Sequence, residues 1–368
     1  MSATPAASRR ALRLGTRGSA LARLQSEQVA DALRARWHAV EIVAVVTAGD
    51  VRPPDTAWGE GAFVGALEHA LLCGEVDLAV HSAKDVPIGE DRPGDRDGGA
   101  ARARADGAAG CPEARAVAPA TDVGGPSGAG PLVIAAYPWR EDPRDALVLP
   151  ASRAGTVPDA PAPALLPLPA PGPIRCGGLD ADLLPSGSRV GTDSPRRAGF
   201  LRAARPDLEI VPLHGNVDTR LRRLDDGNAG ALVLAVAGLL RLGHAARISC
   251  AIDPEIVPPA PAQGALAVQC RSDDGEVRAA LAGLDDPSIR LAVETERAVL
   301  RAAGGGCRAP LGAFATVSGG VIDLVAGAVA ADGRATMTRS SAPEAAWREL
   351  AESTARALLR SGYPGADE

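Results

Sequence analysis

The chain has 368 residues, more than a typical single domain holds, so two or three domains are expected. Its formal net charge of −6 argues against nucleic-acid binding, and no apolar run is long enough for a transmembrane helix. The six cysteines form no C-x-x-C pair and the histidines show no zinc-like spacing, so we expect a metal-free cytoplasmic protein with reduced thiols.

The first segment alternates between strand and helix patterns. Strands and helices are predicted in turn over residues 11–16, 19–37, 40–46, 62–73 and 77–82. Ser19 is expected to cap the first helix. The apolar face of that helix is expected to hold Leu21, Leu24 and Val29. The β-branched run at 40–46 predicts a buried strand. This alternation predicts an α/β fold with mainly parallel strands.

Two stretches interrupt the pattern. Residues 89–130 are rich in Gly, Ala, Asp, Arg and Pro without an apolar period, and residues 150–178 are rich in Pro and Ala. Such compositions are typical of flexible or extended surface segments, and the second favours polyproline II. We expect both to be insertions outside the cores.

Two further units follow. In the second, strands are predicted over 189–192, 209–213, 231–236 and 264–270, and helices over 195–204 and 217–224. In the third, helices are predicted over 287–303 and 343–360, and strands over 321–330 and 336–340. One stripe of the last helix is expected to hold Trp347, Leu350, Thr354 and Leu358.

Two polar clusters end the predicted strands of the first unit. Arg17 and Ser19 stand where a strand runs into a helix N-terminus, which can bind an anion, although a plain helix cap looks the same. Lys84 and Asp85 follow an apolar strand, at the end where open α/β sheets bind ligands. A carboxylate there can act as an acid, a base or a cation stabiliser, although a surface ion pair would give the same pattern.

Arginines gather in the second unit. Arg196 and Arg197 begin a helix, where their charges oppose the helix dipole, and an anionic partner would relieve that cost. Arg220 and Arg241 lie farther along. Each of them alone is more often a solvated side chain, but several convergent arginines indicate a polycarboxylate ligand.

A single cysteine follows a glycine run in the third unit. Gly304, Gly305 and Gly306 end a long helix and precede Cys307. A thiol presented on such a loop can be a nucleophile or an attachment point. Without further context, a buried and inert thiol is the commoner case.

These clusters, in this order, resemble the porphobilinogen deaminase family. The matching stretches are LGTRGSALA (14–22), EVDLAVHSAKDVP (75–87), REDPRDALV (140–148), VGTDSPRR (190–197), HGNVDTRL (214–221), LAVAGLLRLG (234–243), APAQGALAVQCR (260–271) and GGGCRAPLGAFA (304–315). They cover nearly everything outside the two insertions and the first ten residues.

The resemblance implies a fold and a domain division. It implies two periplasmic-binding-protein-like (type II) α/β domains plus a small C-terminal α/β domain that carries the cofactor cysteine. Domain 1 would comprise residues 1–138 and 264–282, domain 2 residues 142–257, and domain 3 residues 285–368. The protein is expected to act as a monomer, with no nucleic-acid or membrane partner.

The resemblance also implies an activity and a set of site residues. Four porphobilinogen molecules would be condensed, each losing ammonia, on a dipyrromethane held by Cys307 through a thioether, and hydroxymethylbilane would be released for haem biosynthesis. Asp85 would be the catalytic carboxylate. Cofactor contacts would come from Arg17, Ser19, Gln25, Ser82, Lys84, Thr192, Ser194, Arg196, Arg197, Arg220 and Arg241. The substrate would be held by Arg17, Arg197, Arg220 and Arg241.

The residue chemistry agrees with this activity. Loss of ammonia from an aminomethyl pyrrole leaves an electron-poor azafulvene, whose positive charge a fixed carboxylate such as Asp85 can stabilise. Each pyrrole carries two carboxylates, so a growing chain accumulates negative charge, which arginines lining the site can bind.

Four positions depart from the family pattern. His214 stands where an arginine is usual, Glu60 where many members have lysine, Asp193 where a small residue is common, and Gly304 where an acidic residue is frequent. Two alternatives therefore stay open. The chain can be a catalytically impaired paralogue, or a sensor of a polycarboxylate ligand built on a periplasmic-binding-protein-like fold.

Overall fold

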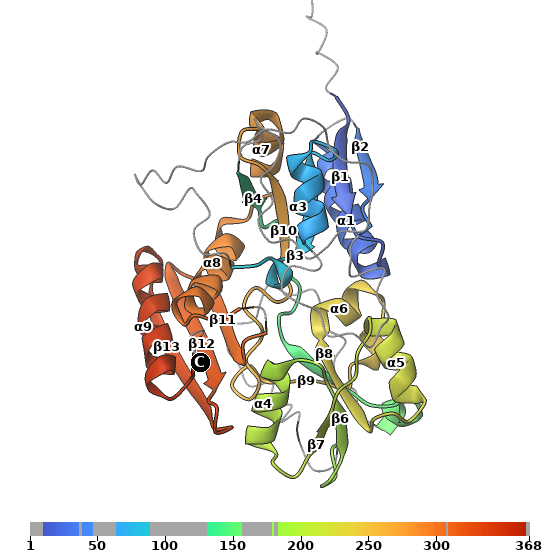
Figure 1. Cartoon of the computed structure of the whole chain (residues 1–368), viewed down its shortest axis with the longest axis vertical. Coiled ribbons are helices and arrows are strands. Elements are labelled where there is room, and N and C mark those ends of the chain that lie inside the picture. Colours follow the sequence, from blue (N-terminus) through green and yellow to red (C-terminus); the bar gives the residue numbers. More distant parts are fainter. Residues whose placement is uncertain are drawn as a thin grey trace, which may run out of the picture.

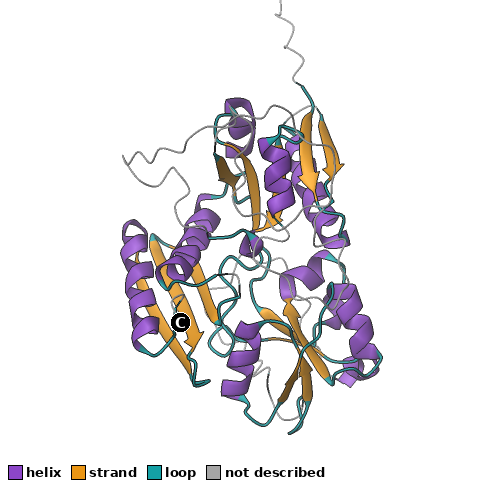
Figure 2. Cartoon of the chain, viewed as in Figure 1, coloured by secondary structure: helices purple, strands orange, loops and turns teal. Residues whose placement is uncertain are grey.

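The computed structural model describes residues 10–36, 39–46, 64–88, 131–156, 179, 183–306 and 308–365. In this part of the chain the strands form three separate sheets, two of five strands and one of three (Figure 1). Helices flank each sheet, so the molecule has three α/β lobes (Figure 2). The predicted α/β class is confirmed.

The first sheet has the order β2-β1-β3-β10-β4. Its strands are β1 (Leu12–Thr16), β2 (Val40–Ala44), β3 (Leu78–Ser82), β4 (Leu132–Ala136) and β10 (Leu266–Arg271). The helices around it are α1 (Ala20–Arg34), α3 (Gly65–Leu72) and α7 (Gly275–Ala282). Strand β1 pairs in parallel with β2 and β3, whereas β10 runs antiparallel to both β3 and β4. Since β3 and β4 are both antiparallel to β10, they point the same way, so four of the five strands are parallel and the expectation of mainly parallel strands is confirmed. Only β10, which returns from the second lobe, enters in the opposite direction.

Two sequence predictions for this lobe, one for helix α1 and one for strand β2, are wrong. Leu24 is 42% exposed, and α1 instead buries Gln25, Ser26 and Val29, so its inner face is partly polar. Strand β2 is an edge strand with alternating exposure rather than a buried one. An apolar run alone does not reveal whether a second neighbour covers the strand.

The second sheet has the order β7-β6-β8-β5-β9. Its strands are β5 (Asp145–Val148), β6 (Arg189–Gly191), β7 (Glu209–Val211), β8 (Ala231–Ala235) and β9 (Cys250–Ala251). The helices are α4 (Pro195–Ala204), α5 (Val217–Asp225) and α6 (Val236–Arg241). Strands β7, β6 and β8 are parallel, and β5 is antiparallel to β8 and β9. The two large sheets thus share one pattern, three parallel strands followed by antiparallel neighbours.

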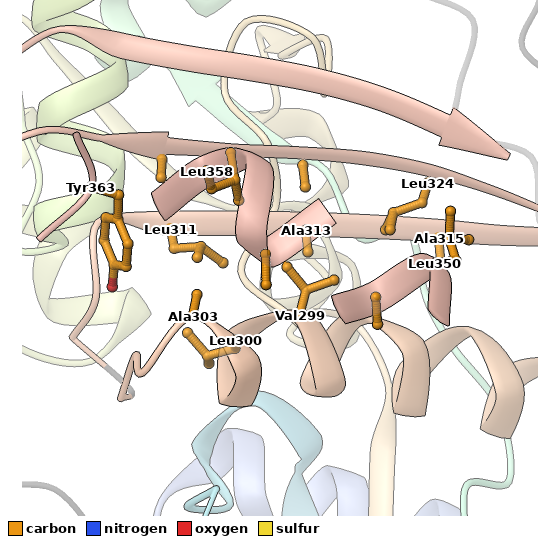
Figure 3. Close-up of a cluster of buried hydrophobic side chains, with 14 of the residues drawn as sticks. Val299, Leu300, Ala303, Leu311, Ala313, Ala315, Leu324, Leu350, Leu358 and Tyr363 are labelled. Atoms are coloured by element: carbon orange, nitrogen blue, oxygen red, sulfur yellow. The ribbon is translucent and has the colours of Figure 1, made fainter. Parts of the chain in front are cut away.

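The third sheet is an antiparallel meander of β11 (Leu311–Ser318), β12 (Val321–Val329) and β13 (Ala335–Pro343). Helices α8 (Pro287–Ala302) and α9 (Trp347–Arg360) pack on one face of it. Figure 3 shows the cluster between them, with Val299 of α8, Leu358 of α9 and Leu324 of the sheet among its members. Leu350, Thr354 and Leu358 are buried and Trp347 packs against the same cluster, as the predicted stripe requires.

The two predicted insertions fall mostly outside the described residues. None of 89–130 is described, and neither is 157–178. The first residues of the second insertion form a short 3₁₀ helix, η2 (Ala151–Thr156), rather than the extended segment expected from its composition. Among the described helices, none has the length and apolar character that crossing a bilayer requires.

Candidate functional site

The carboxyl ends of β1 and β3 bring the first predicted residues together. Ser19 caps α1, and its hydroxyl accepts a hydrogen bond from the backbone N–H of Ala22 at 3.3 Å. One turn later, Gln25 donates its amide Nε2 to the Ser82 hydroxyl at 3.0 Å. Arg17 lies in the turn between β1 and α1. Parallel strands end at one edge of a sheet, which is why segments far apart in sequence meet there.

Lys84 and Asp85 lie in a 3₁₀ turn, η1 (Ala83–Asp85), directly after β3. The turn is held from the third lobe, because Arg297 of α8 donates to the carbonyls of Ala83 at 3.2 Å and Val86 at 2.9 Å. A buried arginine thus fixes the backbone on both sides of the predicted catalytic carboxylate.

Lys84 is connected to the second lobe through a glutamine. Its ammonium donates to Gln263 Oε1 at 3.2 Å, and Gln263 Nε2 donates to Asp145 Oδ1 at 2.8 Å. Burial lowers the pKa of Lys84 to about 8, although the neighbouring Asp85 carboxylate acts in the opposite direction. The ammonium is therefore a cation that is poorly solvated and close to titration.

Asp145 lies between the two arginines that begin α4. Arg196 donates to its Oδ2 at 2.8 Å, and Arg197 donates to its Oδ1 through Nε at 3.0 Å and Nη2 at 2.7 Å. Burial alone would raise the pKa of Asp145, but the two guanidinium groups outweigh burial and hold the pKa well below its usual range.

Asp145 therefore takes up part of the hydrogen-bonding capacity of both arginines. Arg197 also donates Nη1 to the Val233 carbonyl at 3.2 Å, so each of its three nitrogens already has a protein partner. Arg196 donates Nη1 to the Pro258 carbonyl as well. The sequence could not reveal this because Asp145 is about fifty residues upstream, on a neighbouring strand.

The ends of β6 and β7 carry the next predicted residues. The Thr192 hydroxyl accepts from the N–H of Ser194, and Ser194 caps α4. Arg220, on α5, donates Nε to the Gly215 carbonyl at 2.7 Å. Burial lowers the pKa of Arg220 to about 10, and the nearby Arg197 adds to that effect. A desolvated arginine of this kind is prepared for an anionic partner.

Arg241 ends α6 at the crossing between the two large lobes. It donates Nη2 to the Gly264 carbonyl at 2.7 Å. Burial lowers its pKa to about 10, partly offset by Glu141. Its buried Nε has no hydrogen-bond partner among the described residues. A buried donor without an acceptor is costly, so the site fits a ligand that brings an acceptor, such as a carboxylate.

A pocket joins the three lobes beside the predicted attachment cysteine. Lys84 of the first lobe and Ser194 and Arg196 of the second line it, together with Gly306 and Arg308 of the third. Cys307 itself lies outside the described residues, but its two neighbours both line this pocket. The cationic residues of this pocket therefore fit a polycarboxylate group attached at this loop.

Several contributors were not found from sequence. Gln263, Asp145 and Arg308 each join or line the site, and Arg297 supports it. Asp145 and Gln263 lie in the family-like stretches 140–148 and 260–271, and this position is the one sequence feature that marks them as candidates. Their contact joins residues 118 positions apart and could not be inferred from spacing.

The four residues that depart from the family pattern lie in different surroundings. His214 and Asp193 meet, with Nδ1 and Oδ2 2.8 Å apart. Gly304 has φ = 67°, a left-handed conformation that favours glycine over an acidic residue. Glu60 lies outside the described residues.

Comparison with known families gives two matches. Residues 12–97 and 116–279 match the family model described as "Porphobilinogen deaminase, dipyromethane cofactor binding domain". Residues 290–359 match the one described as "Porphobilinogen deaminase, C-terminal domain".

Curated relatives agree over almost the whole chain. Porphobilinogen deaminase of Acidothermus cellulolyticus is 41% identical, covering 98% of this chain and 92% of that protein. The enzyme of the same name from Syntrophobacter fumaroxidans is 38% identical, covering 96% and 98%. Among solved structures, the methionine-binding protein MetQ is similar at 14% identity, with a TM-score of 0.37 over 74% of this chain and 89% of that chain.

Proposed function

Since the chain belongs to the porphobilinogen deaminase family, we propose that it is a working hydroxymethylbilane synthase. It would join four porphobilinogen molecules on a dipyrromethane carried by Cys307, with loss of one ammonia per molecule, and release hydroxymethylbilane. The observation that carries the proposal is the pocket that Lys84 and Arg196 line together with Gly306 and Arg308, the two chain neighbours of Cys307.

Asp85 would stabilise the reacting pyrrole. When ammonia leaves the aminomethyl group of porphobilinogen, positive charge develops on the ring, and a carboxylate fixed beside it lowers the energy of that state. Arg297 holds the backbone on both sides of Asp85, which keeps the carboxylate in place without solvent reorganisation. The same carboxylate can accept the proton lost when the rings are joined.

The remaining predicted residues would hold carboxylates and the attached group. The dipyrromethane, when bound, supplies the primer to which the first substrate ring is joined. We propose that it is held by Arg17, Ser19, Gln25, Ser82, Lys84, Thr192, Ser194, Arg196, Arg197, Arg220 and Arg241. Among these, Arg220 and Arg241 are the strongest candidates for substrate carboxylates, since partial burial lowers the pKa of both and neither is bonded to a carboxylate among the described residues. Arg197 would serve mainly by holding Asp145, and would have to share its nitrogens with a ligand.

We also propose the domain division 1–138 with 264–282, 142–257 and 285–368, since each part contains one complete sheet. A monomer in the cytoplasm, acting on free porphobilinogen, agrees with an active pocket built by lobes of one chain.

One experiment tests the function and the attachment site together. The protein is produced in a host that makes porphobilinogen, its intact mass is measured, and turnover of porphobilinogen is assayed. We expect a covalent dipyrromethane that is absent from Cys307→Ala, and turnover that Asp85→Asn reduces by about a thousandfold or more while the adduct and fold remain. An unmodified wild-type mass would refute the proposal. A stable adduct without turnover would instead favour the impaired paralogue.

A further inference from the structure

An acidic side chain stands among the cations at the edge of the second sheet. Asp193 lies between β6 and α4, and His214 lies between β7 and α5. Their side chains are 25% and 26% exposed, with His214 Nδ1 2.8 Å from Asp193 Oδ2. The approach is close, but its angles do not meet the geometry of a hydrogen bond.

This pair adjoins Arg220. Gly215, which follows His214, accepts the hydrogen bond from Arg220 Nε at 2.7 Å. The loop between β7 and α5 therefore positions both the imidazole and the guanidinium. Burial and Arg197 lower the pKa of Arg220, whereas the Asp193 carboxylate acts in the opposite direction. Since His214 precedes Gly215 and contacts Asp193, the hydrogen bond from Arg220 to Gly215 also brings Arg220 near Asp193, which can serve as a partial counter-ion.

We propose that Asp193, held by His214, is a specificity-determining residue that competes with ligand carboxylates for Arg220. Arg220 has a single hydrogen bond to other described residues, through Nε, so its two Nη groups are available to a ligand. A carboxylate entering there meets the repulsion of Asp193, whose Oδ2 lies 2.8 Å from His214 Nδ1. The pair sets how tightly this position binds.

The inference rests on the proposed function, in which the ligand carries many carboxylates. A chain that gains two carboxylates with each added pyrrole binds more tightly as it grows, unless some contacts are kept weak. An internal carboxylate at one arginine weakens ground-state binding at that position without removing the cation. Such a residue is expected to affect KM more than kcat, because weak uniform binding changes KM alone.

The fold supplies a matched control. Asp218 forms a second His–Asp pair, with its Oδ1 2.8 Å from His244 Nε2. It stands two residues before Arg220 on α5, a spacing at which helical side chains do not face each other. Asp218→Asn therefore removes one negative charge, as Asp193→Asn does, but it removes it from a side chain that does not face Arg220.

The experiment compares Asp193→Asn, Asp193→Ser and Asp218→Asn in the holoenzyme. KM and kcat for porphobilinogen are measured, and equilibrium binding of porphobilinogen is measured by calorimetry in an Asp85→Asn background. We expect both Asp193 variants to lower KM and the dissociation constant about threefold to tenfold, with kcat changed less than twofold. Asp218→Asn should leave both unchanged. His214→Gln should raise KM in the wild type but not in Asp193→Asn.

Unchanged or weaker binding in both folded Asp193 variants would overturn the inference. An equal gain in porphobilinogen affinity in Asp218→Asn would also overturn it, because the effect would then come from the net charge of the protein. A protein that binds porphobilinogen without turnover would refute the proposed function alone, because the calorimetric comparison still decides the role of Asp193.

Discussion

The site's cations differ from ordinary surface arginines and lysines in their solvation. Lys84, Arg220 and Arg241 all have pKa values lowered by burial, and none has a directly bonded carboxylate among the described residues. Arg196 and Arg197 are also buried, but they share the carboxylate of Asp145, which offsets one of their two charges. The first three are therefore better suited to receive carboxylates from outside, whereas part of the capacity of the last two is used within the protein.

Lys84 should give the activity a pH dependence of defined sign. Burial lowers its pKa from 10.5 to about 8, so the ammonium is charged below that pH and neutral above it. KM for porphobilinogen should rise about tenfold between about pH 7 and pH 9.5 as the attraction for ligand carboxylates is lost. In Lys84→Arg, whose guanidinium stays charged, the rise should be absent.

Steady-state kinetics over this pH range, with Lys84→Gln as the permanently neutral control, checks the prediction. Lys84→Gln should have a high KM at every pH. A wild-type KM that stays flat through pH 8 would contradict the assignment.

At the scale of elements, local sequence was most informative where a helix begins. Helix α4 spans the predicted residues, because Ser194 caps it and Pro195 suits its first turn. Strands β4, β5, β9 and β11 and helices α6 and α7 are not predicted by the sequence. Strand β5 illustrates the reason: Asp145 is a polar residue at its start, and the partner arginines that make its burial tolerable come from another element.

The stability of helix α8 depends on its N-cap residue, Asp286, in a way that can be measured. Asp286 accepts hydrogen bonds from the N–H groups of Ser288 at 2.9 Å and Ile289 at 3.0 Å. Asp286→Ala should lower the free energy of unfolding by about 1 kcal/mol, because two backbone donors lose their acceptor. Asp286→Asn, which caps equally well, should change it little. Urea denaturation of both variants decides the matter, and equal losses would show that the charge rather than the cap is responsible.

At the scale of the whole molecule, one carboxylate joins the three lobes. Glu296 of α8 accepts two hydrogen bonds from Arg140, at 2.7 and 3.0 Å. It also accepts from the N–H of Ala262, at the return crossing, and of Ala315, on β11, each at 2.7 Å. Glu296 is fully buried and Arg140 nearly so. The lobes are thus connected at the point where the chain passes between them, next to Pro261, which lines the pocket.

Removing this charge should weaken the association of the lobes. Glu296→Gln leaves the Arg140 guanidinium buried without a counter-ion, which should cost about 3–5 kcal/mol of unfolding free energy. Arg140→Lys keeps the charge but loses the bidentate contact with Glu296, so the decrease in unfolding free energy should be smaller. Glu294→Gln, which can still accept from the Tyr137 hydroxyl, serves as the control.

Urea unfolding and limited proteolysis measure both effects. We expect Glu296→Gln to be cleaved faster than the control. Wild-type stability in Glu296→Gln would mean that Arg140 finds another partner and that the connection is not needed.

The sequence by itself determined the α/β class, most helices and the set of candidate site residues, because these follow from local periodicity, capping residues and contiguous motifs. Only the tertiary structure decided which arginines remain available to a ligand. Arg197 has all three nitrogens bonded within the protein and Arg196 shares one nitrogen between Asp145 and Pro258, whereas Arg220 and Arg241 each have one hydrogen bond to a described residue and no bonded carboxylate. Only the structure brought Asp193 to His214. The physical reason is the same throughout: burial and charge pairing depend on elements far apart in sequence, which local patterns do not encode.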